Sequence, residues 1–146
     1  MTPSKACKEA FLHIVEPELL SWKLCQHPNG MSCYGGCDYG YRWDLADTRN
    51  PRDVRLVSFS IINPGQQLVI EALRGVTIED TPSSLPLVYS NTKGVFRLTR
   101  KWSIRRPLTG CIFRFERGTG TATDAAFALM HEVRVRLPKL YDYLYR

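Results

Sequence analysis

Hydrophobic and polar residues alternate with two different periods along this chain of 146 residues, and each period predicts a different element. A period of two places neighbouring side chains on opposite faces of a strand. Segment 54–62 shows it clearly, because Val57, Phe59 and Ile61 fall on one face and Ser58 on the other. The same pattern predicts about seven short strands, at 39–45, 54–62, 68–73, 76–79, 87–90, 94–104 and 111–116.

A short helix is predicted near the beginning of the chain. Residues 4–15 carry apolar side chains at helical spacing, with Ser4 in the N-cap position. Because the residue before a proline is pushed out of the helical conformation, Glu16-Pro17 is expected to end this helix. The following stretch, 26–40, contains proline and glycine breakers and is expected to be a loop.

The best-marked element is a second helix near the other end of the chain. Thr123 or Asp124 is expected to cap it, and Pro138 is expected to stop it. Glu132 and Arg136 stand four positions apart, which predicts an ion pair on the solvent side of the helix. Its apolar side repeats at helical spacing through Phe127, Met130, Val133 and Leu137.

Together these elements predict a single α+β domain. About seven short, mainly antiparallel strands curve into a sandwich or barrel, which the C-terminal helix closes and to which the short N-terminal helix is added. We divide the chain into an N-terminal helix with a Cys/Gly-rich loop (1–40), a core of strands and helix (41–137) and an aromatic tail (138–146). The helix is expected to bury four side chains against the sheet: Phe113, Phe115, Phe127 and Met130.

The charge of the chain is positive and unevenly distributed. Twenty Lys and Arg stand against 14 Asp and Glu, a net charge of +6 that favours acidic partners. Residues 93–117, the basic segment, contain eight basic residues and one acidic residue. Arg105 and Arg106 lie at its middle, in a predicted turn. A guanidinium donates two parallel hydrogen bonds to a phosphate or carboxylate, so this pair is the first candidate for anion binding.

The cysteines bear on both compartment and metal binding. Five cysteines, an odd number, without an export signal indicate reduced thiols, and therefore the cytoplasm or the nucleus. Cys25, His27, Cys33 and Cys37 are side chains of the kind that binds zinc. Their spacing matches no standard zinc-finger pattern, so we expect no structural zinc. No apolar run approaches the roughly 20 residues that span a bilayer, so no transmembrane segment is predicted.

The sequence carries no catalytic signature. It has no Gly-x-Ser-x-Gly motif, no phosphate-binding Gly-rich loop and no His-Glu-x-x-His motif. Its three histidines lie in separate predicted elements, so nothing in the sequence brings one of them next to a cysteine nucleophile. We therefore expect a protein that is not an enzyme and that needs no cofactor.

Four short motifs follow one another in the second half of the chain, over roughly residues 94–137. They are Phe96-Arg97-Leu98, Arg105-Arg106-Pro107-Leu108-Thr109-Gly110, Phe113-Arg114-Phe115 and Asp124-Ala125-Ala126-Phe127. In this order they resemble the insulin-receptor-substrate (Dok-like) type of phosphotyrosine-binding (PTB) domain, a branch of the pleckstrin-homology superfold. That family has an aromatic pair, an Arg-Arg-x-x-Ser/Thr-Gly turn, an alternating Phe strand and a helix with an embedded Phe.

The resemblance implies an adaptor with a PH/PTB-like core that mediates protein–protein interaction. In this mode an extended peptide adds a strand beside the sheet and lies along the closing helix. The basic turn then binds an acidic or phosphorylated residue of the peptide, and side chains of the helix form its pockets. The residues expected to contact the ligand are Arg105, Arg106, Arg100, Lys101, Phe127 and Met130.

Two other functions fit the same residues. One is a small basic nucleic-acid-binding protein, such as a viral RNA-binding protein, that uses the Lys93–Arg117 surface. Trp102 stands among basic residues and is suited to stacking on a base. Arg100, however, shares a strand face with apolar residues, which weakens a flat basic platform. The other is a structural domain that assembles through its Tyr-rich tail.

Overall fold

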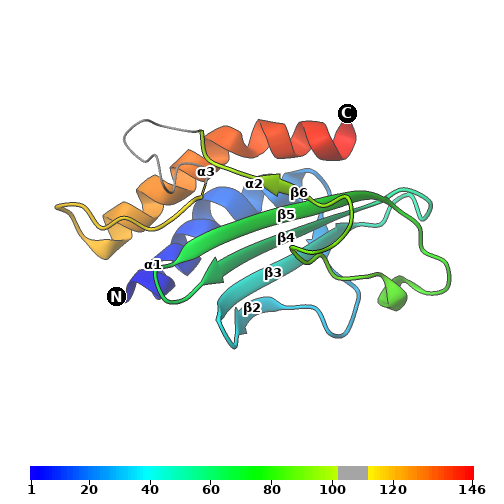
Figure 1. The fold of residues 1–146 in the computed structure, drawn as a ribbon, viewed down its shortest axis with the longest axis horizontal. Coiled ribbons are helices and arrows are strands. Elements are labelled where there is room, and N and C mark those ends of the chain that lie inside the picture. The colour runs from blue at the N-terminus through cyan, green and yellow to red at the C-terminus, as the bar shows by residue number, and fades with distance from the viewer. Residues whose placement is uncertain (102–111) are drawn as a thin grey trace.

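A mainly antiparallel sheet with helices from both ends of the chain makes up the fold, which confirms the predicted α+β class (Figure 1). The computed structural model describes residues 1–101 and 112–146. The helical elements are α1 (Pro3–Ala10), a π-helical turn (Phe11–Val15), α2 (Glu16–Ser21), a 3-10 turn (Pro82–Ser84) and α3 (Ala122–Tyr145). The strands are β1 (Cys25–Gln26), β2 (Tyr34–Cys37), β3 (Gly40–Asp47), β4 (Val54–Ile62), β5 (Gln67–Val76) and β6 (Phe96–Leu98).

The strands of the described residues form one open six-stranded sheet. Its order is β1-β3-β4-β5-β6, and β2 pairs with β3 further along the same edge as β1. The predicted barrel or sandwich does not form among these residues. The strands at the two edges are short, and helices rather than a second sheet cover one face (Figure 1). No helix in the described part of the chain is both long enough and apolar enough to span a membrane.

The strand register places a row of large apolar side chains against the helices. Trp43, Phe59 and Ile70 lie directly opposite one another on β3, β4 and β5, and Leu98 extends the row into β6. Phe11 from the π-helical turn stacks on this row, with its ring centroid 4.0 Å from that of Trp43 and 4.3 Å from that of Phe59. All five side chains are buried. The N-terminal helices therefore belong to the main core and are not an extension of it.

The C-terminal helix α3 packs against α1, the π-helical turn and the sheet. Of the four predicted core side chains, Phe113 and Met130 are buried, whereas Phe115 and Phe127 are only partly buried at the margin of the core. The buried side of α3 extends well beyond the predicted stripe and comprises Ala122, Ala126, Leu129, Met130, Val133, Leu137, Leu140 and Leu144.

The N-terminal helix begins earlier and continues further than predicted. Its N-cap is Thr2, whose side chain accepts a hydrogen bond from the Lys5 N–H, and not Ser4. Pro17 does not end the helical segment, because it stands in the first turn of α2 after the π-helical turn. A proline in a first turn has no intrahelical N–H bond to lose, so the sequence rule that predicted a stop does not apply there.

The limits of α3 also differ from the prediction. Thr121 is the N-cap and forms a capping box with Asp124. Pro138 lies inside the helix, which continues to Tyr145. An interior proline removes one backbone hydrogen bond and is destabilising by about 3 kcal/mol. Two features offset this loss: the burial of leucines beyond the proline, and polar contacts that fix the end of the helix to the sheet.

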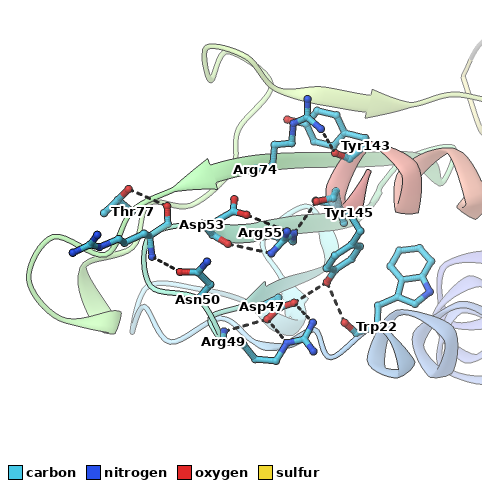
Figure 2. Close-up of polar contacts among 12 residues, drawn as sticks. Trp22, Asp47, Arg49, Asn50, Asp53, Arg55, Arg74, Thr77, Tyr143 and Tyr145 are labelled. Atoms are coloured by element: carbon cyan, nitrogen blue, oxygen red, sulfur yellow. Dashed lines mark hydrogen bonds and ion pairs between the residues drawn. The ribbon is translucent and has the colours of Figure 1, made fainter.

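These polar contacts join the last turn of α3 to β4 and β5 (Figure 2). Arg55 Nε donates to the carbonyl oxygen of Leu144 at 2.7 Å, and Arg74 Nη1 donates to that of Tyr143 at 2.8 Å. The Arg55 guanidinium also lies over the Tyr145 ring, and that of Arg74 over the Tyr143 ring. Cations at a helix C-terminus satisfy its free carbonyls and interact favourably with the helix dipole.

A buried carboxylate completes the attachment of α3. Asp47 at the end of β3 is almost fully buried and accepts hydrogen bonds from Arg49 Nε at 2.9 Å and from the Tyr145 hydroxyl at 2.9 Å (Figure 2). The Tyr145 oxygen lies 3.1 Å from the carbonyl oxygen of Trp22 as well. Burial of Asp47 opposes its ionisation, but the hydrogen bonds from Arg49 and Tyr145 outweigh burial and lower the pKa of this carboxyl.

Several strand predictions change in the structure. The predicted strand 68–73 lies within β5, which continues through Gly75, with its positive φ of 69°, and ends at Val76. Most of the predicted strand 76–79 is therefore not a strand, because residues 77–79 are irregular. Segment 87–90 is not a strand, and it covers the face of the sheet opposite the helices. The predicted loop 26–40 contains β2, which pairs with β3. No local sequence pattern predicted this pairing.

The two strands of the basic segment are also shorter than predicted. Of 94–104, β6 is the part that forms a strand within the described residues. Of 111–116, the described part makes one isolated bridge, between Arg114 and Gln67 on β5. This bridge places the 113–115 stretch next to the start of β5, on the same edge as β6.

Candidate functional site

The Arg105–Arg106 pair lies outside the described residues, as does Trp102. Among the described basic residues of the basic segment, Arg97 is paired with Glu71, with Arg97 Nη2 3.1 Å from Glu71 Oε2. Four others are exposed at the surface, namely Lys93, Lys101, Arg114 and Arg117. In the sequence, Lys93 and Lys101 precede the 102–111 stretch, and Arg114 and Arg117 follow it. The accessible positive charge thus lies on both sides of that stretch in the sequence.

Arg100, a predicted ligand contact, is a buried side chain with 2% exposure. Its Nε lies 2.9 Å from Glu132 Oε1, and its Nη1 lies 3.4 Å from Glu116 Oε1. The sequence predicted that Arg136 would pair with Glu132, but Arg136 Nε donates to the carbonyl of Thr99 at 3.2 Å. Both arginines therefore hold the segment that follows β6 against α3.

An open hollow of about 340 Å³ lies between α3 and the 114–120 segment. On the helix side it is lined by Asp124, Ala125, Ala128, Leu129 and Glu132. On the opposite side it is lined by Arg114, Glu116, Gly118 and Gly120. The alanines and glycines carry a methyl group or no side chain, so space remains between the two walls.

The two predicted helix contacts lie on other sides of α3. Met130 is completely buried in the core, and it does not line the hollow. Phe127 is partly buried, and its ring centroid lies 6.0 Å from that of His13 on the N-terminal segment. Sequence spacing placed these residues on the apolar side of the helix, and that side faces the core. The hollow is instead lined by the smaller side chains next to it.

The electrostatics of the hollow combine paired and accessible charges. Glu116 and Glu132 both contact the buried Arg100. Asp124 accepts the N–H of Thr121 as part of the capping box. Arg114 is exposed at the rim. Arg114 therefore favours an anion, whereas the start of α3 is already occupied by the Asp124 carboxylate of the capping box.

The four metal candidates do not converge. Among the residues that the structure describes, no group of three or more His, Cys, Asp or Glu side chains could hold a metal ion. Cys25 is exposed, whereas Cys33 and Cys37 are of intermediate exposure. His27 has both ring nitrogens engaged: Nε2 donates to the carbonyl of Pro86 at 2.9 Å, and Nδ1 accepts the N–H of Asn29 at 3.1 Å.

His27 should make stability depend on pH. Burial lowers the pKa of His27 and outweighs the carbonyl of Pro86, which raises it. The unfolded chain therefore binds a proton at higher pH than the folded chain. The stabilisation is complete above about pH 6.5, the ordinary pKa of histidine, and is lost as pH falls below it. We expect a slope of at most about 1.4 kcal/mol per pH unit from this one group.

Urea unfolding between about pH 7.5 and 5.5 measures this slope, a range that avoids the ordinary carboxyl pKa values. His27→Gln should flatten the dependence in this range. His131→Gln is the matched control, because His131 is exposed on α3, and this variant should keep the wild-type slope. An unchanged slope in His27→Gln would show that His27 is not the group responsible.

The face of the sheet opposite the helices carries buried charges that the sequence analysis did not identify. Asp44, Ser58 and Glu71 lie directly opposite one another on β3, β4 and β5, and Arg97 on β6 extends this row. Arg42, two residues before Asp44 on the same face, donates from Nε to Asp44 Oδ1 at 2.9 Å. Arg42, Asp44 and Glu71 are all buried. The alternating polar positions of β3 and β4 were a signal of this row, but they also fit a solvent-exposed face.

The charges are buried because the chain between β5 and β6 crosses this face. The carbonyl of Val88 accepts a hydrogen bond from Arg42 Nη2 at 2.6 Å. Ser90 Oγ donates to Glu71 Oε1 at 3.2 Å. Leu85 and Val88 form a second, smaller apolar core with the end of the sheet. Burial alone would lower the pKa of Arg42, but Tyr39 and Asp44 outweigh it and raise that pKa, so the guanidinium stays charged.

Two of the hollows lined by the described residues lie on different sides of the molecule. The hollow beside α3 is open and has an exposed arginine at its rim. The polar face of the sheet is partly covered and holds paired, buried charges. No known protein family, curated protein or solved structure matches this chain.

Proposed function

We propose that this protein is a non-catalytic, PTB-like binding module that takes an acidic or phosphorylated peptide segment in the hollow beside α3. The observation that carries the proposal is the open hollow between the closing helix and the 114–120 segment, at the end of the basic segment. An extended peptide is a suitable occupant, since one wall of the hollow is a helix and the other is extended chain.

Backbone contacts supply the affinity in this proposal. On the side of β5, the bridge between Arg114 and Gln67 is made by the carbonyl of Phe113 and the N–H of Phe115. The peptide pairs with the 116–118 stretch on the side that faces α3, as in strand addition to a sheet. Ala125, Ala128 and Leu129 form a shallow apolar floor for one peptide side chain. The proposed arrangement is that of a strand added between a sheet edge and a helix.

Positive charge selects the acidic or phosphorylated residue. Arg114, exposed at the rim, favours an anion. Lys101 and Arg117 are exposed nearby in the sequence, and Arg105 and Arg106 lie between them. A charge-assisted pair of this kind contributes about 1.5–3 kcal/mol.

Nucleic acid is the alternative ligand for the same positive charges. A basic sheet surface would need the basic segment to form strands, and the described part of the segment contributes β6 and one isolated bridge. Arg97 and Arg100 are also engaged in ion pairs. Fewer cations are therefore available for phosphate contacts than the sequence indicated, and this difference favours the peptide.

Binding of fluorescent acidic and phosphotyrosine peptides to matched charge variants tests the proposal. Arg114→Ala/Arg117→Ala and Arg105→Ala/Arg106→Ala should each weaken peptide binding about 10- to 100-fold. Arg134→Ala/Lys139→Ala removes the same charge from exposed positions of α3 that do not line the hollow. This control should bind like the wild type.

Salt dependence separates the two ligand classes. Peptide affinity should persist in part at about 0.5 M salt, because backbone pairing and apolar contacts are not screened. RNA affinity should fall by orders of magnitude between about 50 and 200 mM if 6–10 phosphates are contacted. Tight RNA binding with a steep salt slope, together with no binding of any peptide, would contradict the proposed function.

A further inference from the structure

A second cavity, of about 170 Å³, lies on the face of the sheet opposite the helices. It is independent of the hollow beside α3, because the two share no lining residue. Ser60 on β4 lies between Arg42 on β3 and Val69 on β5, its direct neighbours across the strands, and all three line the cavity. Tyr89, from the chain that crosses this face, also lines it.

The charges at this cavity are already balanced. Arg42 is paired with Asp44 at 2.9 Å, and Glu71 is paired with Arg97 at 3.1 Å. The side chains of Arg42 and Glu71 are 10% and 4% exposed. A ligand with a net charge would lose its hydration on entering the cavity. The opposite charges of Arg42 and Glu71 are already paired and would not compensate for that loss. The cavity therefore favours a neutral ligand that has hydrogen-bond donors and acceptors.

Ser60 is the feature that points to a ligand. Its side chain lines the cavity and the residue is only 4% exposed, yet its hydroxyl has no hydrogen bond to any residue that the structure describes. The Ser60 oxygen keeps accessible surface in the cavity, so it can form a hydrogen bond there. A polar atom of a bound ligand supplies a hydrogen-bond partner for this hydroxyl.

The shape and walls of the cavity limit the ligand to a small ring system. A cavity of this size is well below the roughly 300–1,000 Å³ of sites for drug-sized ligands. Tyr39 and Tyr89 are 40% and 51% exposed, so both rings keep accessible surface, and both line the cavity. Ile62 and Val69 add apolar surface. Aromatic and apolar walls of this kind suit a planar ring that stacks on tyrosine.

Donors and acceptors of the two charged residues remain available. A guanidinium has five N–H donors, and the bonds from Arg42 to Asp44 and to the carbonyl of Val88 use two of them. A carboxylate has about four acceptor positions, and Glu71 accepts from Ser90 and Arg97. The cavity thus offers a donor group on one strand and an acceptor group on another.

We propose that this cavity binds a single nucleobase and prefers guanine. Guanine is neutral and planar, and it carries acceptors (O6 and N7) next to donors (N1–H and the N2 amino group). Arg42 donates to O6, and Glu71 accepts from N1–H and the amino group. Ser60 bonds to a ring heteroatom, and Tyr89 stacks on the ring. Adenine carries an amino donor where guanine has O6, so it cannot accept a hydrogen bond from Arg42 at that position.

Isothermal titration calorimetry with guanosine, adenosine, cytidine and uridine tests this proposal on the full chain. Guanosine should bind with a Kd between about 10 μM and 1 mM, at least about tenfold tighter than the other three. Ser60→Ala should weaken guanosine binding by roughly fivefold. Tyr89→Ala should weaken it by roughly 5- to 100-fold. Tyr34→Ala changes a tyrosine of similar exposure to Tyr39 that does not line the cavity, and it should have no effect.

A short RNA with one guanine, and the same RNA with uracil in its place, identifies the source of the base. Tighter binding of the guanine RNA than of guanosine would show that the base is presented by a strand, and equal binding would show a free nucleoside. Equal affinity for all four nucleosides, or no binding at about 5 mM, would overturn the proposal. Guanosine affinity that is unchanged in both folded variants, Ser60→Ala and Tyr89→Ala, would overturn it as well.

Discussion

Phe11→Ala is expected to lower the free energy of unfolding by about 3–5 kcal/mol. Phe11 is fully buried, and its ring contacts the rings of Trp43 and Phe59 at the centre of the main core. Truncation removes the buried ring and leaves a cavity between the helices and the sheet, which fixed strands cannot fill. Urea unfolding followed by circular dichroism measures the change, and a loss of this size is enough to unfold a domain of marginal stability.

Phe127→Ala is the matched comparison, because it removes the same side chain from α3. Phe127 is only partly buried at the margin of the core, so a smaller loss of about 1–2 kcal/mol is expected. The sequence named Phe127 as a core side chain and placed Phe11 only on the apolar side of the first helix. If Phe127→Ala destabilised the protein as much as Phe11→Ala, the N-terminal segment would not have the central place in the core described above.

Asp44→Ala is expected to have a similarly large effect, about 3–5 kcal/mol, for an electrostatic reason. Its carboxylate is paired with Arg42, and it also accepts the N–H of Cys33 at 2.9 Å. The side chains of Arg42 and Asp44 are 10% and 2% exposed. Removal of Asp44 leaves a buried guanidinium without its carboxylate, and water reaches it poorly. Chemical denaturation at neutral pH measures the loss.

Two further variants separate the buried charge from other effects. Asp53→Ala breaks an ion pair with Arg55 in which Asp53 is 43% exposed, so it should cost only about 0–1 kcal/mol. The double variant Arg42→Met/Asp44→Leu removes both buried charges and should recover much of the loss of Asp44→Ala. A double variant that is no more stable than Asp44→Ala would show that the unpaired guanidinium is not the cause.

The two proposed sites place different demands on the fold. The hollow beside α3 lies next to an isolated bridge and an exposed chain segment, where strand addition requires no rearrangement of the core. The cavity on the opposite face depends on the position of the chain that carries Tyr89 and Ser90, which hydrogen bonds to Arg42 and Glu71 hold in place. The two proposed sites share no lining residue, so the proposals predict no competition between a peptide and a nucleobase.

The sequence by itself determined the elements whose patterns are local. β4 has the bounds that its alternation predicted, and Val57, Phe59 and Ile61 face the main core together. The apolar stripe of α3 was also correct at Met130 and Val133. In both cases one side of the element is buried along its length, so the spacing of apolar residues reports the buried side directly.

Only the tertiary structure decided features that depend on residues far apart in the chain. Pro138 does not end α3, because side chains from β4 and β5 fix the last turn of the helix. Segment 87–90 was predicted to be a short strand, yet it lies across the sheet and pairs with no strand of the described residues. Propensity and periodicity describe neighbours in sequence, and contacts of this kind override them.

The same distinction applies to the candidate sites. The sequence located the basic segment, but the partners of Arg97 and Arg100 show that part of its charge stabilises the fold. The buried row on the opposite face had no sequence signal of burial, because alternating polar residues normally face water. Burial there depends on the chain between β5 and β6, whose carbonyl at Val88 lies 46 residues from its donor, Arg42. Solvent exclusion is a property of such long-range contacts, and only the folded structure contains them.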